Sequence, residues 1–92
     1  MMNKYEATFI LYSEDERFKK GLDSVKAELS KIGAKIQKEE DLGIRELAYL
    51  IKKESRGHYF YFELEAEPAG VGSIDKNLNL NIDLLKYLFV RK

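Results

Sequence analysis

The chain has 92 residues, of which 45% are hydrophobic and 35% charged, the balance of a globular protein and not of a disordered or membrane-embedded one. A chain of this length closes one hydrophobic core, so we expect a single domain over residues 1–92, with no separate catalytic lobe. Sixteen basic and sixteen acidic side chains give a formal net charge of zero, so nucleic-acid binding would require charges that are segregated on the surface.

Cysteine is absent, which excludes disulfides, thiolate metal sites and cysteine nucleophiles and agrees with a reducing compartment. No apolar run approaches the length that spans a bilayer. The first residues also lack an apolar segment followed by a small-residue cleavage site. We therefore expect a cytoplasmic protein.

Residues 4–12 predict a strand, because apolar side chains recur at every second position. The side chains expected to face the core are Tyr5, Ala7, Phe9 and Leu11. Ser13 followed by Glu16 predicts a capping box that opens a helix. The apolar residues of that helix recur at spacings of three and four. They are Phe18, Leu22, Val25, Leu29 and Ile32. Gly33 is expected to end the helix with a left-handed cap.

Residues 34–52 predict a long second strand, irregular through the charged segment 38–41 and bent or bulged at Gly43. Residues 53–57 predict a hairpin turn, and 58–67 a third strand. Its inward side chains are expected to be Phe60, Phe62 and Leu64, and its outward ones Tyr59, Tyr61, Glu63 and Glu65.

Pro68 is expected to open a second helix, which carries apolar residues at Val71, Ile74 and Leu78 and fades within the asparagine-rich stretch 77–81. Residues 85–91 predict the last strand. The element order βαββαβ, with a tight hairpin only in the middle, is the split βαβ arrangement of the ferredoxin-like fold, of the α+β class. Right-handed crossovers place both helices on one face of a four-stranded antiparallel sheet, so the open face is where we expect function.

The residues offer little for catalysis, since there is one histidine and no recognisable Ser-His-Asp set. His58 is interpreted as an exposed residue at a strand end. The acidic run 39–41 lacks the spacing of a calcium loop and is interpreted as solvated, so we expect no metal and no cofactor. The glycines of segment 70–72 are too few for a phosphate loop and fall in the first turn of a helix.

Segment 56–62 begins with the Arg-Gly of the RNA-recognition motif signature, a module that stacks bases on the aromatic rings of its sheet. The agreement then fails, because Phe60 shares its face with expected core residues. The outward Tyr59 and Tyr61 continue into Glu63 and Glu65, which would repel phosphate. Base stacking is therefore the weaker hypothesis.

Basic residues outnumber acidic ones around the central hairpin, and further basic residues lie on the two strands expected at the centre of the sheet or at their ends. The hairpin set is Arg45, Lys52, Lys53 and Arg56, and the others are Lys4, Lys86, Arg91 and Lys92. Such side chains are by default solvated. The half of the molecule expected to carry them is nevertheless more positive than the first helix and the acidic part of the second strand, so a one-sided phosphate contact is a hypothesis.

Segment 43–52, GIRELAYLIK, resembles the signature of the bacterial ribosomal protein S6 family: a glycine, a basic and a polar position, then Leu-Ala-Tyr and an isoleucine before a basic or small residue. The resemblance extends to segment 4–6, to Gly33 and Ala34, and to the basic end of the last strand, so it covers essentially the whole chain. Leu50 departs from it, because many relatives have proline there. Leucine restores a backbone donor and adds an apolar side chain, so strand pairing and the partner surface should differ locally.

The resemblance implies a non-enzymatic structural protein of the small ribosomal subunit that pairs with small-subunit ribosomal protein eighteen and binds the central domain of small-subunit rRNA. It implies no membrane and no small-molecule substrate. The phosphate contacts it suggests are Lys4, Arg45, Lys52, Lys53, Arg56, Lys86 and Arg91. The protein-partner surface, suggested by apolar residues on the open face, comprises Ile10, Tyr59, Tyr61, Leu88 and Val90. Within the signature, Leu47, Tyr49 and Ile51 are interpreted as core residues.

Two alternatives remain from other classes. One is a ferredoxin-like regulatory or small-ligand-binding domain that dimerises through its sheet, with a defined pocket and no affinity for RNA. The other is an acylphosphatase-like enzyme, which would need a phosphate-binding loop with arginine and glycine after the first strand. Segment 12–16 is acidic instead, which argues against an anion there.

Overall fold

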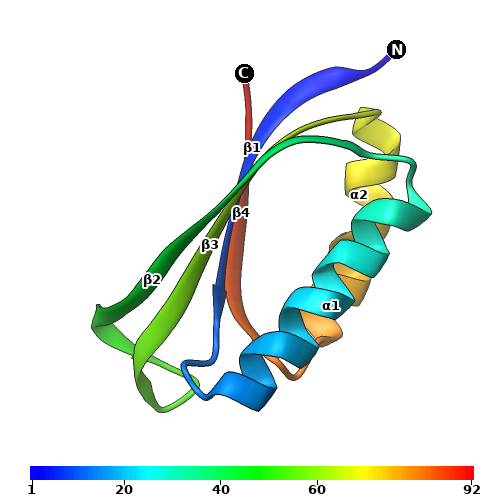
Figure 1. Cartoon of the computed structure of the whole chain (residues 1–92). Helices are drawn as coiled ribbons and strands as arrows, with labels where there is room; N and C mark the ends of the chain where they lie inside the picture. Colours follow the sequence, from blue (N-terminus) through cyan, green and yellow to red (C-terminus); the bar gives the residue numbers. More distant parts are fainter.

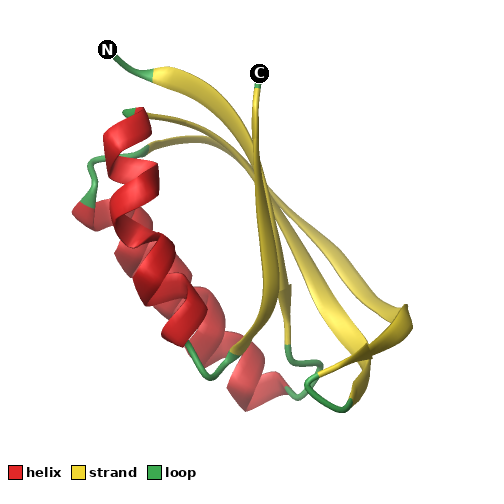
Figure 2. Cartoon of the chain, turned by 180° about the vertical axis from the view of Figure 1, so that it is seen from behind, coloured by secondary structure: helices red, strands yellow, loops and turns green.

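The computed structural model describes all 92 residues, in the chain order β1 (Asn3–Leu11), α1 (Asp15–Lys31), β2 (Lys35–Ile51), β3 (Glu54–Ala66), α2 (Pro68–Leu80) and β4 (Leu84–Arg91). The strands form one sheet in the order β2-β3-β1-β4, and every neighbouring pair is antiparallel. Both helices lie on the same face of the sheet (Figure 1, Figure 2). The predicted ferredoxin-like split βαβ fold is confirmed.

The core lies between the helices and the two central strands. Phe9 on β1 is opposite Phe60 on β3, Ala7 is opposite Phe62, and the Phe9 and Phe62 rings meet edge to face at 5.7 Å. Both of these rings are fully buried, as are Val25 and Leu29 of α1 within a few per cent. Burying a phenylalanine contributes about 1.5–3 kcal/mol. The predicted alternation of β1 and the apolar stripe of α1 are therefore confirmed.

The sequence predicts the C-terminal end of α1 correctly but not its N-terminal cap. Its N-cap is Glu14, which is extended and makes no side-chain cap hydrogen bond, so the predicted capping box of Ser13 and Glu16 is wrong. The C-terminal end agrees with prediction. Gly33 has φ of 69° and donates to the Ser30 carbonyl, while Ala34 donates to Leu29, the two bonds of a Schellman motif.

The β2–β3 turn is tighter than predicted. Its two central residues are Lys52 and Lys53, with φ of 49° and 67°, and Ile51 pairs directly with Glu54. Positive φ at both central positions is the type I′ geometry that matches strand twist, although lysine is not a residue that favours it. The segment 53–57, predicted as a turn, is therefore mostly strand, because ladder pairing of β3 continues through it.

Helix α2 begins with Pro68 at its first turn, as predicted. It does not fade at the asparagines but continues to Leu80, because Leu78 is only 2% exposed and its burial outweighs the weak helix preference of its neighbours. Neither helix has both the length and the apolar character needed to cross a lipid bilayer.

Two leucines of α2 provide a matched test of this packing. Leu78 is 2% exposed and Leu80 is 68% exposed. Leu78→Ala should lower the free energy of unfolding by about 2–5 kcal/mol, because it leaves a cavity, and Leu80→Ala should change it by less than about 0.5 kcal/mol. Urea titration of both variants measures this. Equal losses would show that α2 is not packed as described.

Candidate functional site: the open face of the sheet

The face of the sheet that the helices leave uncovered brings together the five residues predicted to contact a protein. Thr8 of β1 is opposite Tyr61 of β3 and Leu88 of β4, and the neighbouring Ile10 is opposite Tyr59 and Lys86. Since side chains alternate across a strand, these residues share one face. The five predicted partner residues all lie on it: Ile10, Tyr59, Tyr61, Leu88 and Val90. Leu88 is 61% exposed and Val90 45% exposed.

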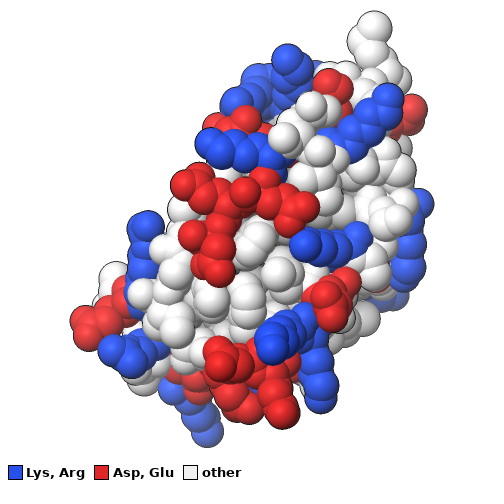
Figure 3. All heavy atoms as spheres, in the orientation of Figure 1, with Lys and Arg blue, Asp and Glu red and all other residues white.

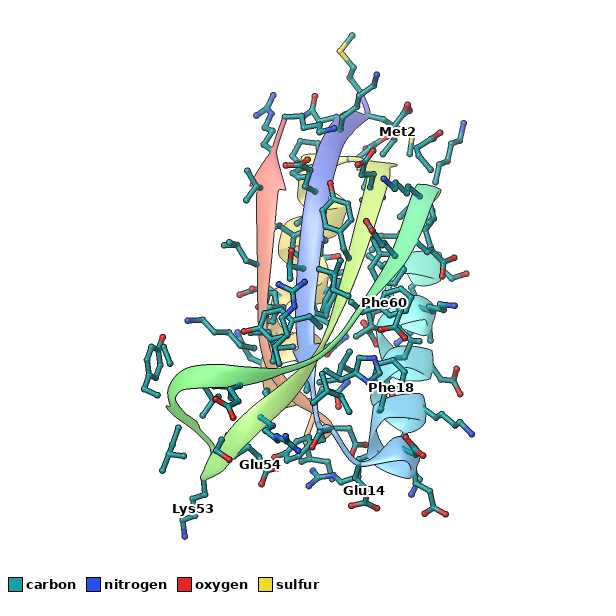
Figure 4. All side chains as sticks on the ribbon, turned by 60° about the vertical axis from the view of Figure 1, so that its left-hand side comes forward. Met2, Glu14, Phe18, Lys53, Glu54 and Phe60 are labelled. Carbon is teal, nitrogen blue, oxygen red and sulfur yellow. The ribbon has the colours of Figure 1, made fainter.

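The end of β2 crosses this face. Segment 44–51, here called the arm, pairs with β3 at residues 44–46 and at Ile51. Between Glu46 and Ile51 the register shifts, and the arm bends over the sheet (Figure 4). Lys52 Nζ donates to the Leu84 carbonyl at 2.8 Å, and Lys86 Nζ lies 3.4 Å from the Tyr49 hydroxyl. The arm thus reaches from one edge strand of the sheet to the other.

An apolar groove of about 350 Å³ lies between the arm and the sheet. Its lining residues are Thr8, Ile10, Leu47, Ala48, Tyr49, Ile51, Tyr59, Lys86, Tyr87 and Leu88. The backbone at Gly57 lies close to two residues that line the groove. A Cβ atom at this position would overlap the Ile10 side chain and lie 3.5 Å from the Leu47 side chain. Grooves of this size with mostly apolar walls are typical sites for apolar side chains or ligands.

Three residues of the groove correct a prediction. Leu47, Tyr49 and Ile51 were expected in the core, but none is buried, and Tyr49 is 65% exposed. The reason is the register shift after Glu46, which turns the arm away from the helices and over the open face. The sequence carried one signal for this, since apolar residues continue through Leu50 on both sides of the arm and no clean alternation assigns a core face.

The base of the arm is fixed by one carboxylate. Asp41 Oδ1 accepts the Gly43 backbone N–H at 2.8 Å, where Gly43 has φ of 84°, and lies 2.6 Å from His58 Nε2. The predicted bulge at Gly43 is confirmed. The hydrogen bond from His58 lowers the pKa of Asp41 below its ordinary value. His58 is not the exposed residue predicted, because its ring stacks on Phe18 of α1 at 3.6 Å and its side chain is 14% exposed.

The predicted RNA-contacting residues fall into two groups at opposite ends of the sheet. At the hairpin end, Lys53 projects from the tip of the turn (Figure 4) and the Arg45 guanidinium lies 5.6 Å from the centre of the Tyr59 ring. The hairpin-end group is Arg45, Lys52, Lys53, Arg56 and Lys86. Lys4 lies at the other end, opposite Glu65. Arg91 is also there but lies opposite Tyr5, on the helix-covered side.

Acidic groups occupy the open face away from the hairpin. Glu6 of β1 is directly opposite Glu63 of β3, and the Tyr61 hydroxyl lies 2.8 Å from one carboxylate and 2.9 Å from the other. Burial, together with both carboxylates, raises the pKa of Tyr61, so its hydroxyl keeps its proton. In the orientation of Figure 3, which looks onto the β2 edge of the sheet, further acidic groups gather beside an uncharged area. The open face therefore carries a directly opposed pair of carboxylates at the end away from the hairpin.

Residues 4–91 match the family described as ribosomal protein S6. The chain belongs to the ribosomal protein S6 family. A member from Treponema denticola, described as small ribosomal subunit protein bS6, is 40% identical over 90 residues, which cover 98% of this chain and 97% of that one. A bS6 protein from Acidiphilium cryptum is 37% identical, and the match covers 98% of this chain and 58% of that longer protein. The resemblance expected from the signature is confirmed.

Solved structures share the fold of this S6-family chain. The crystal structure of 30S ribosomal protein S6 from Thermotoga maritima superimposes with a TM-score of 0.88 at 22% identity, covering all of this chain and 89% of that one. The C-terminal domain of the MgtC protein from Mycobacterium tuberculosis reaches 0.68 at 10% identity, over 99% and 88% of the two chains. The second likeness shows that the fold alone does not distinguish function.

The Asp41 contacts predict how stability depends on pH. A lowered pKa in the folded chain means that Asp41 stabilises the fold at pH values above its ordinary 3.8, and that this contribution is lost as the pH falls through the lowered value. Asp41→Asn should therefore be less stable than the parent at about pH 6, and the difference should shrink below about pH 4. Denaturant titrations across this range measure it, with exposed Asp23→Asn as the control. A difference independent of pH would contradict the prediction.

Proposed function

We propose that the chain is a structural, non-catalytic component of the bacterial small ribosomal subunit, located in the ribosomes of the cytoplasm. In this role it binds the central domain of small-subunit rRNA together with small-subunit ribosomal protein eighteen. Membership of the ribosomal protein S6 family over residues 4–91 supports the ribosomal role. The observation that carries the partner assignment is the uncovered apolar face of the sheet.

The partner surface is supported by exposure and shape. Leu88, Val90 and Tyr49 are 45–65% exposed and stand around or beside the apolar groove. Exposed apolar residues that cluster on one face of a small protein mark a contact site, because leaving them in water costs free energy that a partner recovers. Two tyrosines on the same face agree with the enrichment of aromatic residues at interfaces.

The RNA contact is assigned to the hairpin end. Lys53 and Arg56 are exposed there, and Arg45 extends the basic surface along the sheet. These side chains can contact several phosphates, but a protein with no net charge does not neutralise enough phosphates to bind RNA tightly by itself. A basic partner on the open face would add the remaining contacts, so binding to RNA should depend on the heterodimer.

The same groove favours one competing function, a small-ligand-binding or regulatory domain that dimerises through its sheet. A volume of about 350 Å³ lies within the range of small-molecule sites. This alternative predicts no RNA affinity in the presence of protein eighteen. It is therefore separated from the ribosomal function by the experiments below.

Charge placed in the apolar groove should prevent the heterodimer. Leu88→Asp should weaken binding to purified protein eighteen by at least about tenfold, because the contact would bury an unpaired carboxylate. Leu80→Asp is the matched control, since Leu80 is 68% exposed but lies on α2. Isothermal titration calorimetry measures both affinities. Equal weakening by both variants would remove the open face as the partner surface.

Loss of the hairpin charges should change the salt dependence of RNA binding. In the heterodimer, Lys53→Ala combined with Arg56→Ala should reduce the slope of log K against log salt by about 1.5–2, the value expected for two phosphate contacts. The control pair is Lys19→Ala with Lys20→Ala on α1, which should leave the slope unchanged. Filter binding to a central-domain rRNA fragment measures it. No binding by the unmodified heterodimer would reject the ribosomal function and favour the ligand-binding one.

A further inference from the structure

The acidic end of the open face has an unusual arrangement of charge. Glu6 and Glu63 are directly opposed on neighbouring strands, a placement of like charges that is destabilising unless a cation lies close to both. Their side chains are 38% and 33% exposed. They are therefore accessible to an incoming group, yet sufficiently shielded that an ion pair there is stronger than at the open surface.

The hydrogen bonds at this place are one donor short. The Tyr61 hydroxyl carries a single proton, but it lies 2.8 Å from Glu6 Oε2 and 2.9 Å from Glu63 Oε2. It donates to one carboxylate at a time, so the other has no donor at its short contact. A carboxylate can accept two or more hydrogen bonds, which leaves room for an additional donor group.

Lys92 supplies charge at this place but completes no hydrogen bond. Its Nζ atom lies 3.6 Å from Glu6 and 3.9 Å from Glu63, beyond hydrogen-bonding distance, and its side chain is 44% exposed. Two other lysines lie nearby: Lys38 of β2 is directly opposite Glu63, with its Nζ atom 3.9 Å from Glu40, and Lys4 is opposite Glu65. Lys92 therefore pairs with the two carboxylates only by charge. A cationic group that came within hydrogen-bonding distance of Glu6 and Glu63 would bind there more strongly than Lys92 does.

The position is continuous with the apolar groove. Glu6 and Ile10 lie on the same face of β1, four residues or about 13 Å apart, with Thr8 between them. One segment of a bound protein can therefore place an apolar side chain in the groove and a basic side chain beside Glu6 and Glu63. The face presents an apolar half and an acidic half to the same partner.

We propose that Glu6, Glu63 and Tyr61 form a receptor for a lysine or arginine side chain of the basic protein that binds the open face. Lys92 occupies this receptor in the free protein and is displaced when the partner binds. This inference rests on the proposed function, because it takes binding of a basic protein to the open face as its starting point. It adds which residues fix the orientation of the bound segment and what competes with it.

The proposal predicts opposite effects for two neutralising substitutions. Lys92→Gln removes the competitor and should tighten binding to protein eighteen by about 2- to 5-fold, the range expected for one exposed ion pair. Glu63→Gln removes half of the receptor and should weaken binding by about tenfold, the loss typical of a charge-assisted hydrogen bond. In the double variant, the gain from Lys92→Gln should disappear, because the two residues act at the same place.

Calorimetric titration of the full chain with protein eighteen measures these affinities, with Lys76→Gln as the control for loss of one positive charge on exposed α2. Urea titration of each variant separates altered binding from altered stability, and Glu6→Gln replaces Glu63→Gln if the latter unfolds. Binding by the unmodified chain without a gain from Lys92→Gln, or a gain that persists with Glu63→Gln, overturns the receptor and leaves the proposed function standing. No binding by the unmodified chain rejects both.

Discussion

The sheet has two faces, but the chain has helices for only one of them. The 17-residue α1 and the 13-residue α2 both pack on the face that carries Phe9 and Phe62. Right-handed crossovers leave no alternative, since each helix must return the chain to the same side. The side chains of the other face must therefore either tolerate water or contact another molecule. The arm of β2 covers one part of this face, and the acidic pair presents charged groups on another part.

The arm depends on a small junction between three elements. Asp41 of β2 binds the backbone of Gly43 and the ring of His58 on β3, and His58 stacks on Phe18 of α1. Beyond this junction the arm pairs with β3 at residues 44–46 and at Ile51, and Lys52 donates a hydrogen bond to the Leu84 carbonyl. Only residues 47–50 of the arm lie outside the ladder, so they are the part of β2 that can adjust to a partner without breaking strand pairing.

The elements that could be predicted from the sequence are those decided by local periodicity. Alternation in β1 and β3, the stripe of α1 and Gly33 at its end all follow from which side chains must be buried within one element. The errors have a different cause. The placement of Leu47 and Ile51 depends on a register shift between strands, and the cover over His58 depends on Phe18, forty residues away in the chain. Such tertiary contacts leave no periodic pattern in one sequence. The open-face set was predictable because alternation assigns it, whereas the pairing of Glu6 with Glu63 required the register of β1 and β3.

Both chain ends leave the sheet on the side away from the β2–β3 hairpin (Figure 1). A segment added after Lys92 would begin far from the basic turn and close to the acidic pair, because Lys92 Nζ lies 3.6 Å from Glu6. The family includes proteins longer than this chain, such as the one from Acidiphilium cryptum. The architecture separates the basic hairpin from the end of the sheet that carries both chain ends, so chain length can change there while the hairpin keeps its geometry.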